Sequence, residues 1–215
     1  MKSLLRALLP ILVVGFCLPI VSRAVLADAP ESVHPLDKGK PAPSALMNAL
    51  DGKEIELSSV IANQPTLLIF YRGGWCPFCN RHLAALGEIY VDLRKLGFQI
   101  VAVSPDSFEA MAETVEKQHL LYKLYSDRNL RLSSLYGVAY RISAETALAY
   151  KENGIALPHV PDSKDSWLPV PTAFVINRTG QITFVYFNPD PSIRISGEEI
   201  LKAAAETIGP VKDHS

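Results

Sequence analysis

The chain has 215 residues, of which 48% are hydrophobic, and its formal net charge is −1. This length supports one α/β domain with a sizeable core and is too short for two large domains. The charge is nearly balanced and unpatterned, so nothing suggests a nucleic-acid partner.

The first 27 residues have the composition of a secretory signal peptide. Two basic residues precede an apolar stretch over residues 8–20, and small residues stand at the −3 and −1 positions of a cleavage site between Ala27 and Asp28. The alternative is an uncleaved membrane anchor. However, the stretch contains two prolines and is shorter than the ~20 apolar residues that a spanning helix needs. We therefore predict a signal peptide over residues 1–27 and an exported mature protein, periplasmic or secreted, without stable membrane association.

The three cysteines divide between this segment and the rest of the chain. Cys17 lies inside the predicted signal peptide, which leaves Cys76 and Cys79 as the two cysteines of the mature protein. A disulfide between residues three apart closes almost no loop and adds little stability. We therefore interpret this pair as chemical rather than structural.

Hydrophobic patterning predicts the elements in chain order. An irregular linker is expected over residues 28–40, followed by one redox domain over residues 41–210. A short edge hairpin is expected around residues 51–57, and further strands are expected at 66–71, 98–103, 121–125, 172–176 and 182–187. Helices are expected at 79–97, after a cap at 104–107, at 127–137 and at 196–208. The intervening residues 138–169 have no clear period and are predicted to be an insertion over one face.

The order of these elements predicts the fold. The first strands are joined by helical crossovers, so they should be parallel, with right-handed connections. The last two strands form a hairpin around residues 177–180 and should be antiparallel. We therefore expect an α/β, thioredoxin-like fold with a mixed central sheet and helices on both faces.

The most informative motif is Trp-Cys-Pro-Phe-Cys, which joins a buried strand to a helical pattern. Pro77 suits the first helical position, which makes Cys76 the N-cap. A thiolate there faces unpaired backbone N–H groups and the positive end of the helix dipole. Such sites lower a thiol pKa from ~8.5 to roughly 3.5–7.5. Cys79, one turn further on, is expected to be more buried and less acidic. The sulfurs are within bonding reach, because Cβ atoms at this helical spacing are ~5–6 Å apart. We predict that Cys76 attacks and Cys79 resolves.

A zinc site and an inert buried pair are the other interpretations of these cysteines. Cys-x-x-Cys is half of a common zinc site, but the chain has no second cysteine pair and its five histidines are scattered. The adjacent Gly-Gly-Trp favours access to the thiols over burial. We therefore predict neither a metal nor a cofactor.

A second diagnostic element, Val170-Pro171-Thr172, precedes the fourth strand of the predicted main sheet. In a thioredoxin-type fold a proline at this place adopts the cis form and lies against the Cys-x-x-Cys, although an X–Pro bond alone is cis in only about 5–6% of cases. An ordinary edge proline is the alternative. We expect Pro171 to leave the Val170 backbone free for a partner's cysteine segment and to help exclude metals. The candidate substrate-binding residues are Trp75, Arg72, Pro171 and Thr172.

From about Pro41 to Ile208 the chain resembles the peroxiredoxin-like branch of the alkyl hydroperoxide reductase/thiol-specific antioxidant family. The resemblance is carried by residues 71–79, 101–105, 126–127, 136–137 and 171–176, together with 167–171 and 188–190. It implies a thioredoxin-like fold and the reduction of hydroperoxides by thiol reductants such as thioredoxin. It also implies that Cys76 is the peroxidatic cysteine and Cys79 the resolving one.

Three positions depart from the pattern of typical peroxiredoxins. Gly73 stands where they have Thr or Ser, Ile69 stands where they have Pro, and Pro171 stands near where an Arg often precedes the penultimate strand. The hydrogen-bond network that activates the peroxide is therefore not visible. Arg72 could substitute for it, although an Arg beside a sheet terminus is more often a solvated charge.

Three functions are considered from the sequence, and the family resemblance favours the first. The first is a thiol peroxidase that forms a Cys76 sulfenic acid and then a Cys76–Cys79 disulfide, recycled by a thioredoxin-type dithiol. The second is an exported thiol–disulfide oxidoreductase that uses the same pair on partner disulfides. The third is a redox sensor whose disulfide alters residues 138–169. Three residues of that segment either shape a substrate face or simply pack, and packing is the more common role: Tyr140, His159 and Trp167.

Overall fold

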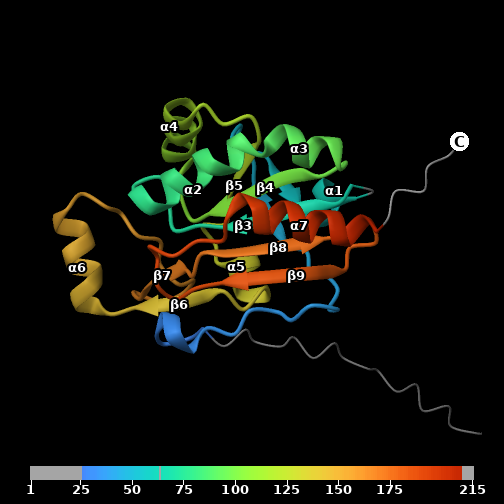
Figure 1. Ribbon diagram of the computed structural model, residues 1–215. Coiled ribbons are helices and arrows are strands. Elements are labelled where there is room, and N and C mark those ends of the chain that lie inside the picture. The colour runs from blue at the N-terminus through green and yellow to red at the C-terminus, as the bar shows by residue number, and fades with distance from the viewer. Residues whose placement is uncertain (1–25, 63, 210–215) are drawn as a thin grey trace, which may run out of the picture.

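The structure is a computed structural model, and we describe its residues 26–62 and 64–209 (Figure 1). A seven-stranded sheet in the order β2-β1-β5-β4-β3-β8-β9 forms the centre. Its strands are β1 (Leu46–Asn48), β2 (Glu54–Glu56), β3 (Thr66–Phe70), β4 (Gln99–Ser104), β5 (Lys123–Ser126), β8 (Thr172–Ile176) and β9 (Ile182–Phe187). The helices are α1 (Leu57–Ile61), α2 (Pro77–Glu88), α3 (Tyr90–Lys95), α4 (Phe108–Gln118), α5 (Arg131–Leu135), α6 (Ala144–Glu152) and α7 (Gly197–Ile208).

The pairing of the strands confirms the predicted mixed sheet. Strands β3, β4 and β5 are parallel, and β8 and β9 are antiparallel additions on the far side of β3. Every residue of β3 is buried, as its uninterrupted apolar run predicts. The strand order places the end of β3 in the middle of the sheet, where the Cys-x-x-Cys turn begins.

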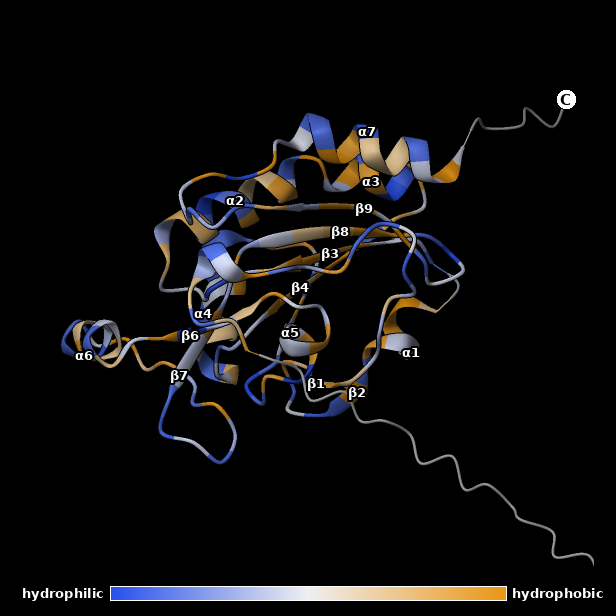
Figure 2. Ribbon diagram, turned by 90° about the horizontal axis from the view of Figure 1, so that it is seen from below, coloured by the Kyte–Doolittle hydropathy of each residue, from blue (hydrophilic) through white to orange (hydrophobic). Residues whose placement is uncertain are grey.

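Side chains of the central strands alternate between two cores, one on each face of the sheet. On one face, Leu67 and Ile69 of β3 contact the apolar sides of α2, α3, α4 and α7. On the other face, Leu68 and Phe70 contact the residues of α1 and α5. Figure 2 shows these two helical layers on opposite sides of the strands. The predicted arrangement, with helices on both faces, is confirmed.

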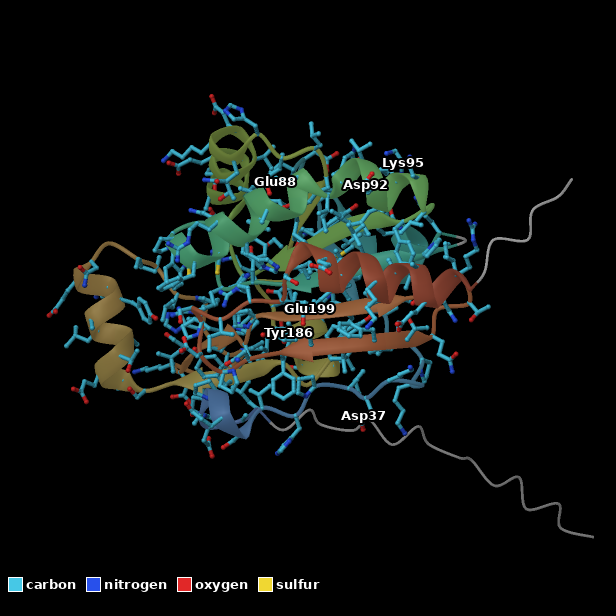
Figure 3. The ribbon with its side chains drawn as sticks, viewed as in Figure 1. Asp37, Glu88, Asp92, Lys95, Tyr186 and Glu199 are labelled. Carbon is cyan, nitrogen blue, oxygen red and sulfur yellow. The ribbon has the colours of Figure 1, made fainter. Side chains whose placement is uncertain are left out.

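The helix predicted over residues 79–97 is two helices, α2 and α3, which meet at Ile89. The start of α7 approaches closely here, because a Cβ atom on Gly197 would lie 2.9 Å from the Ile89 side chain. Exposed charges mark the outer side of this layer: Lys95 pairs with Asp92 at 2.8 Å on α3, and Glu199 closes the capping box of α7 (Figure 3). Hydrophobic periodicity continues across the break, which explains why the sequence predicts one helix.

Residues 138–169 are more regular than predicted. Strands β6 (Ala139–Ile142) and β7 (Ser166–Pro169) pair as a separate antiparallel sheet, and α6 lies between them in the chain. This β6–α6–β7 excursion projects to one side of the main body (Figures 1 and 2). Each of its two strands has only four residues, and α6 buries none of its residues. The sequence therefore shows no clear apolar period in this segment.

The predicted linker over residues 28–40 is attached to the domain. Val33 is buried, and the Leu36 amide donates a hydrogen bond to the Tyr136 carbonyl at 3.1 Å. Just before it, the Arg141 amide donates to the carbonyl of Ala27, the last residue of the predicted signal peptide, at 2.7 Å. Residues 1–25 of the predicted signal peptide, including Cys17, lie outside the described residues. Within the described part of the chain, no helix is long and apolar enough to cross a membrane.

Candidate active site

The cysteine turn lies between the end of β3 and the start of α2. Cys76 is the N-cap of α2 and Pro77 occupies the first turn, as predicted. The Gly74 amide donates to Asp106 Oδ2 at 2.9 Å, so the end of β4 holds this turn in place. Gly73 has φ +146°, and a Cβ atom there would lie 2.4 Å from the Trp75 indole nitrogen. A Thr or Ser cannot occupy that position in this conformation, which accounts for the first departure from the peroxiredoxin pattern.

Both thiols are free and buried in the core beneath α2, each with about 1% exposure. The expectation that the Gly-Gly-Trp sequence exposes the cysteines is therefore wrong for Cys76, and the Trp75 side chain packs against the same core. Burial does not make the pair inert, because the two sulfurs interact with each other and with charged side chains.

The two thiols differ in acidity in the predicted direction. A hydrogen bond from the Cys79 thiol lowers the pKa of Cys76 to about 6, with further lowering by the Cys79 backbone amide and the charges of Arg72 and Arg194. The same thiol hydrogen bond and burial raise the pKa of Cys79 well above its usual range. One pH unit changes the ratio of thiolate to thiol tenfold, so Cys76 is mainly a thiolate at pH 7.

Arg72 is a core residue at the thiol rather than a solvated charge. Its side chain is about 8% exposed, and its Nη1 lies 4.0 Å from the Cys76 sulfur. Its guanidinium carbon lies 4.9 Å from the centroid of the Trp75 ring and 5.8 Å from that of Tyr150, and Nη2 donates a hydrogen bond to the Tyr150 hydroxyl. The favoured interpretation of Arg72 as a solvated side chain is wrong, because two aromatic rings enclose its guanidinium.

Arg194 is a residue of the site that the sequence reasoning missed. It lies in the connection between β9 and α7, and its Nη2 is 3.6 Å from the Cys79 sulfur. Burial and the charge of Arg194 lower the pKa of His82, one turn after Cys79, to about 4, so this imidazole is neutral at pH 7. No local motif marks Arg194, which is 115 residues from Cys79 along the chain. Each thiol thus faces one guanidinium.

Pro171 and Thr172 lie where predicted, but their backbone differs from the prediction. Thr172 pairs with Phe70 at the end of β3, beside the cysteine turn. The described residues contain no cis peptide bond, so the expected cis form of Pro171 is wrong. Val170 is not free for a partner, because its amide donates to the Val138 carbonyl and its own carbonyl accepts from Thr172 Oγ1, each at 2.8 Å. The amide bond continues the pairing of β6 and β7, which the sequence did not reveal, by one residue, and the carbonyl bond is local to the start of β8.

The three residues singled out within 138–169 have different surroundings. Trp167 is fully buried against Leu130 and Ala139, which is a packing role. His159 is exposed and contacts the Lys164 carbonyl. Burial raises the pKa of Tyr140 to about 12, with smaller effects from the charges of Arg72 and Cys76. Tyr140 therefore borders the site, whereas the other two do not contribute to it.

A cleft of about 520 Å³ adjoins the turn on the side of α4. Gly74, Trp75 and Asn80 contribute one wall, and the residues that follow α6 contribute another. Its lining carries cations and anions, including Lys117 and Glu113. Neither cysteine is among the residues that line this cleft.

The chain is similar to known proteins in sequence and in fold. The model of the AhpC/TSA family matches residues 38–185. The thiol-disulfide oxidoreductase ResA of Bacillus cereus is 24% identical over 145 residues, which are 67% of this chain and 66% of that protein. The chloroplastic peroxiredoxin Q of Oryza sativa subsp. japonica is 22% identical over 153 residues, or 71% of this chain and 60% of that protein. The matched region thus spans a little under two thirds of these relatives.

A solved structure shares the fold. The crystal structure of a peroxiredoxin-like protein from Aquifex aeolicus superposes with a TM-score of 0.63 at 18% identity, covering 81% of this chain and 89% of that one. The family model matches more than half of the chain, and the cysteine turn lies inside the match. The protein therefore belongs to the AhpC/TSA family.

Proposed function

We propose that the protein is a thiol-dependent peroxidase in which Cys76 is the peroxidatic and Cys79 the resolving cysteine. The observation that carries this proposal is the Cys76 sulfur, held mainly as a thiolate by the Cys79 thiol and with Arg72 Nη1 4.0 Å away. Membership of the AhpC/TSA family supports the same reaction class. A buried thiolate with an adjacent cation is suited to attack a neutral hydroperoxide, because the cation stabilises charge that develops on the transferred oxygens.

The reaction has three steps. The Cys76 thiolate attacks the terminal peroxide oxygen, the O–O bond breaks, and the departing alkoxide or hydroxide takes a proton to leave as alcohol or water. The Cys79 thiol then attacks the sulfenic acid of Cys76, which forms the disulfide and releases water. An external dithiol of the thioredoxin type reduces that disulfide, becomes oxidised itself, and restores both thiols.

Arg72 replaces the network that the sequence lacks. Gly73 provides no hydroxyl beside the sulfur, and Pro171 provides no guanidinium. The Arg72 side chain supplies a positive charge and N–H donors at the same sulfur from the loop before α2. Arg194 supplies a positive charge and N–H donors at the sulfur of Cys79, which attacks in the second step.

The test is oxidation of the reduced, signal-free protein by hydrogen peroxide and by cumene hydroperoxide. We expect both to be consumed much faster than by a free thiol, and we expect a Cys79→Ser variant to react once and stop as a sulfenic acid. Consumption at the rate of a free thiol would overturn the proposal. A disulfide that forms without turnover by any dithiol would favour a redox sensor instead.

Thiol–disulfide exchange is the second candidate function. It is favoured by the 24% identity to a thiol-disulfide oxidoreductase and by the absence of a hydroxyl at Gly73. In that reaction Cys76 attacks a partner's disulfide and Cys79 releases the partner. A Cys79→Ser variant would then accumulate mixed disulfides with exported proteins, whereas the peroxidase predicts none in the absence of peroxide.

We also propose export through residues 1–27. The basic start, the apolar stretch and the small residues before Asp28 support this location. The signal-peptide hypothesis predicts that the exported chain begins at Asp28, which N-terminal sequencing of the periplasmic or secreted protein tests. A full-length chain retained in the membrane fraction would contradict it.

A further inference from the structure

Helix α6 is tied to the active site through one side chain. None of its nine residues, all of which are described, is buried, and Leu148 on this helix is 56% exposed. The helix stands at the outer end of the β6–α6–β7 excursion (Figures 1 and 2). From there Tyr150 reaches the cysteine turn, where its ring centroid lies 5.1 Å from that of Trp75 and its hydroxyl accepts a hydrogen bond from Arg72.

We propose that Tyr150 is a positioning residue that holds the Arg72 guanidinium against the Cys76 sulfur, so that the seating of α6 sets both the reactivity and the accessibility of this thiol. Small hydroperoxides react with α6 seated, whereas a protein dithiol reaches the sulfur only after α6 has moved.

The hydrogen-bond geometry supports the positioning role. The guanidinium has two ends: Nη2 donates to the Tyr150 hydroxyl, while Nη1 lies 4.0 Å from the Cys76 sulfur. The rings of Trp75 and Tyr150 contact the same guanidinium. A planar guanidinium fixed at one end and enclosed by two rings has little freedom to turn its other end away from the sulfur. Without Tyr150, the guanidinium keeps the Trp75 ring contact but loses the hydrogen bond that fixes its Nη2 end.

The burial of the sulfur supports the access role. The Cys76 residue is about 1% exposed while the Trp75 and Tyr150 rings are in contact. In a disulfide exchange, the attacking sulfur must approach along the axis of the S–S bond that it breaks. Because α6 has no buried side chain, it is the part of the surroundings that moves at the lowest cost to the core.

Several ionisable groups other than Tyr150 interact electrostatically with the two sulfurs, and replacing Tyr150 removes none of them. For each cysteine, one of these groups is the thiol of the other cysteine. The others are Arg72, Arg194 of the β9–α7 connection, Tyr71 just after β3 and Tyr140 of β6. A change in the Cys76 titration on replacing Tyr150 therefore reports on the position of Arg72 rather than on a new charge.

The first test measures the Cys76 thiolate without any peroxide. The reduced protein is alkylated with iodoacetamide between pH 4 and pH 9, and mass spectrometry locates the modified cysteine. We expect the Cys76 pKa to rise in Tyr150→Phe and to rise further in Tyr150→Ala, with Cys76 alkylation at pH 6 slowed about tenfold in the latter. The matched control is Tyr186→Phe on β9, which also removes a tyrosine hydroxyl but at a position away from α6 (Figure 3). Its Cys76 pKa should equal that of the wild type. An unchanged or lowered pKa in both Tyr150 variants would overturn the proposal.

The second test compares a small and a bulky thiol reagent at a pH where Cys76 is fully ionised in every variant. We measure the ratio of the Cys76 modification rate with a polyethylene-glycol maleimide to the rate with iodoacetamide. We expect this ratio to rise in Tyr150→Ala and to stay unchanged in Leu148→Ala, whose side chain already faces solvent. An unchanged ratio would overturn the access role. This inference rests on the proposed function only for the identity of the reductant: if the wild type does not reduce peroxides yet the Cys76 pKa shifts, the function fails and the positioning role stands.

Discussion

The cysteine turn and the β6–α6–β7 excursion are built in opposite ways. The turn follows a strand whose residues are all buried and opens a helix whose cysteine, Cys79, lies in the core. The excursion is a separate two-stranded sheet with a helix that buries nothing. The Cys76 sulfur is thus positioned by elements with many buried residues, and it is covered by a segment whose helix has none. Stability and reactivity should therefore respond to different mutations.

Removing the reactive sulfur should have the largest effect on activity. If activity were unchanged, the cysteine turn would not be the reactive region. We expect Cys76→Ser to abolish peroxide reduction entirely, because the hydroxyl does not ionise in this pH range and forms no sulfenic acid. Peroxide consumption in the presence of a dithiol reductant measures it. Circular dichroism should show an unchanged fold, and residual turnover above a few per cent would mean that another group carries the chemistry.

Truncations in the two regions should differ in their effect on stability. Leu83→Ala removes a fully buried side chain of α2 and should lower the free energy of unfolding by about 2–5 kcal/mol. Leu148→Ala on α6 removes an exposed side chain and should change it by about 0.5 kcal/mol or less. Urea unfolding of the two variants tests this pair, and a large loss in Leu148→Ala would show that α6 belongs to the core.

Neutralising Arg72 should alter the pH dependence of the first step. The wild-type oxidation rate should fall as the pH drops through about 6, because Cys76 then becomes protonated. Arg72→Gln removes the cation 4.0 Å from the sulfur, so the midpoint should move upward and the rate at pH 6 should fall about tenfold. Stopped-flow rates between pH 5 and pH 9 provide the measurement. A midpoint that stays at about 6 would assign the low pKa to the Cys79 hydrogen bond alone.

Neutralising Arg194 should have the smallest effect on the reaction rates. That effect should fall on the second step, formation of the Cys76–Cys79 disulfide. Arg194→Gln should slow disulfide formation a few-fold, because Nη2 lies 3.6 Å from the Cys79 sulfur. The oxidation of Cys76 should change less. Arg81→Gln, at an exposed position of α2, is the matched control. Trapping of the sulfenic acid with dimedone separates the two steps, and equal slowing of both would contradict the assignment of Arg194 to Cys79.

The fold and the cysteine turn could be predicted from sequence because their signals are local. The apolar run of β3, the Pro77 after Cys76 and the helical spacing of Leu83 and Leu86 each lie within a few residues. The N-cap position is confirmed. The acidity of Cys76 relative to Cys79 has the predicted direction, but its largest cause is the Cys79 thiol rather than the helix terminus. The predicted roles of Cys76 and Cys79 in catalysis remain predictions.

The surroundings of the thiols could not be predicted, because they depend on distant contacts. Arg194 reaches Cys79 from another connection, and Tyr150 reaches Arg72 from an exposed helix without an apolar stripe. The Val170 amide, expected to be free, is bonded by the carbonyl of Val138, the residue before β6. In each case the missing information is which residues the tertiary structure brings together.

The most direct test of the account is the rate at which hydrogen peroxide oxidises the reduced, signal-free protein, followed by tryptophan fluorescence in a stopped-flow instrument. The account predicts a second-order rate constant several decades above that of a free thiol, with a pH midpoint at about 6 and complete loss in Cys76→Ser. A rate constant near that of a free thiol would contradict it and would leave thiol–disulfide exchange as the function of the same pair.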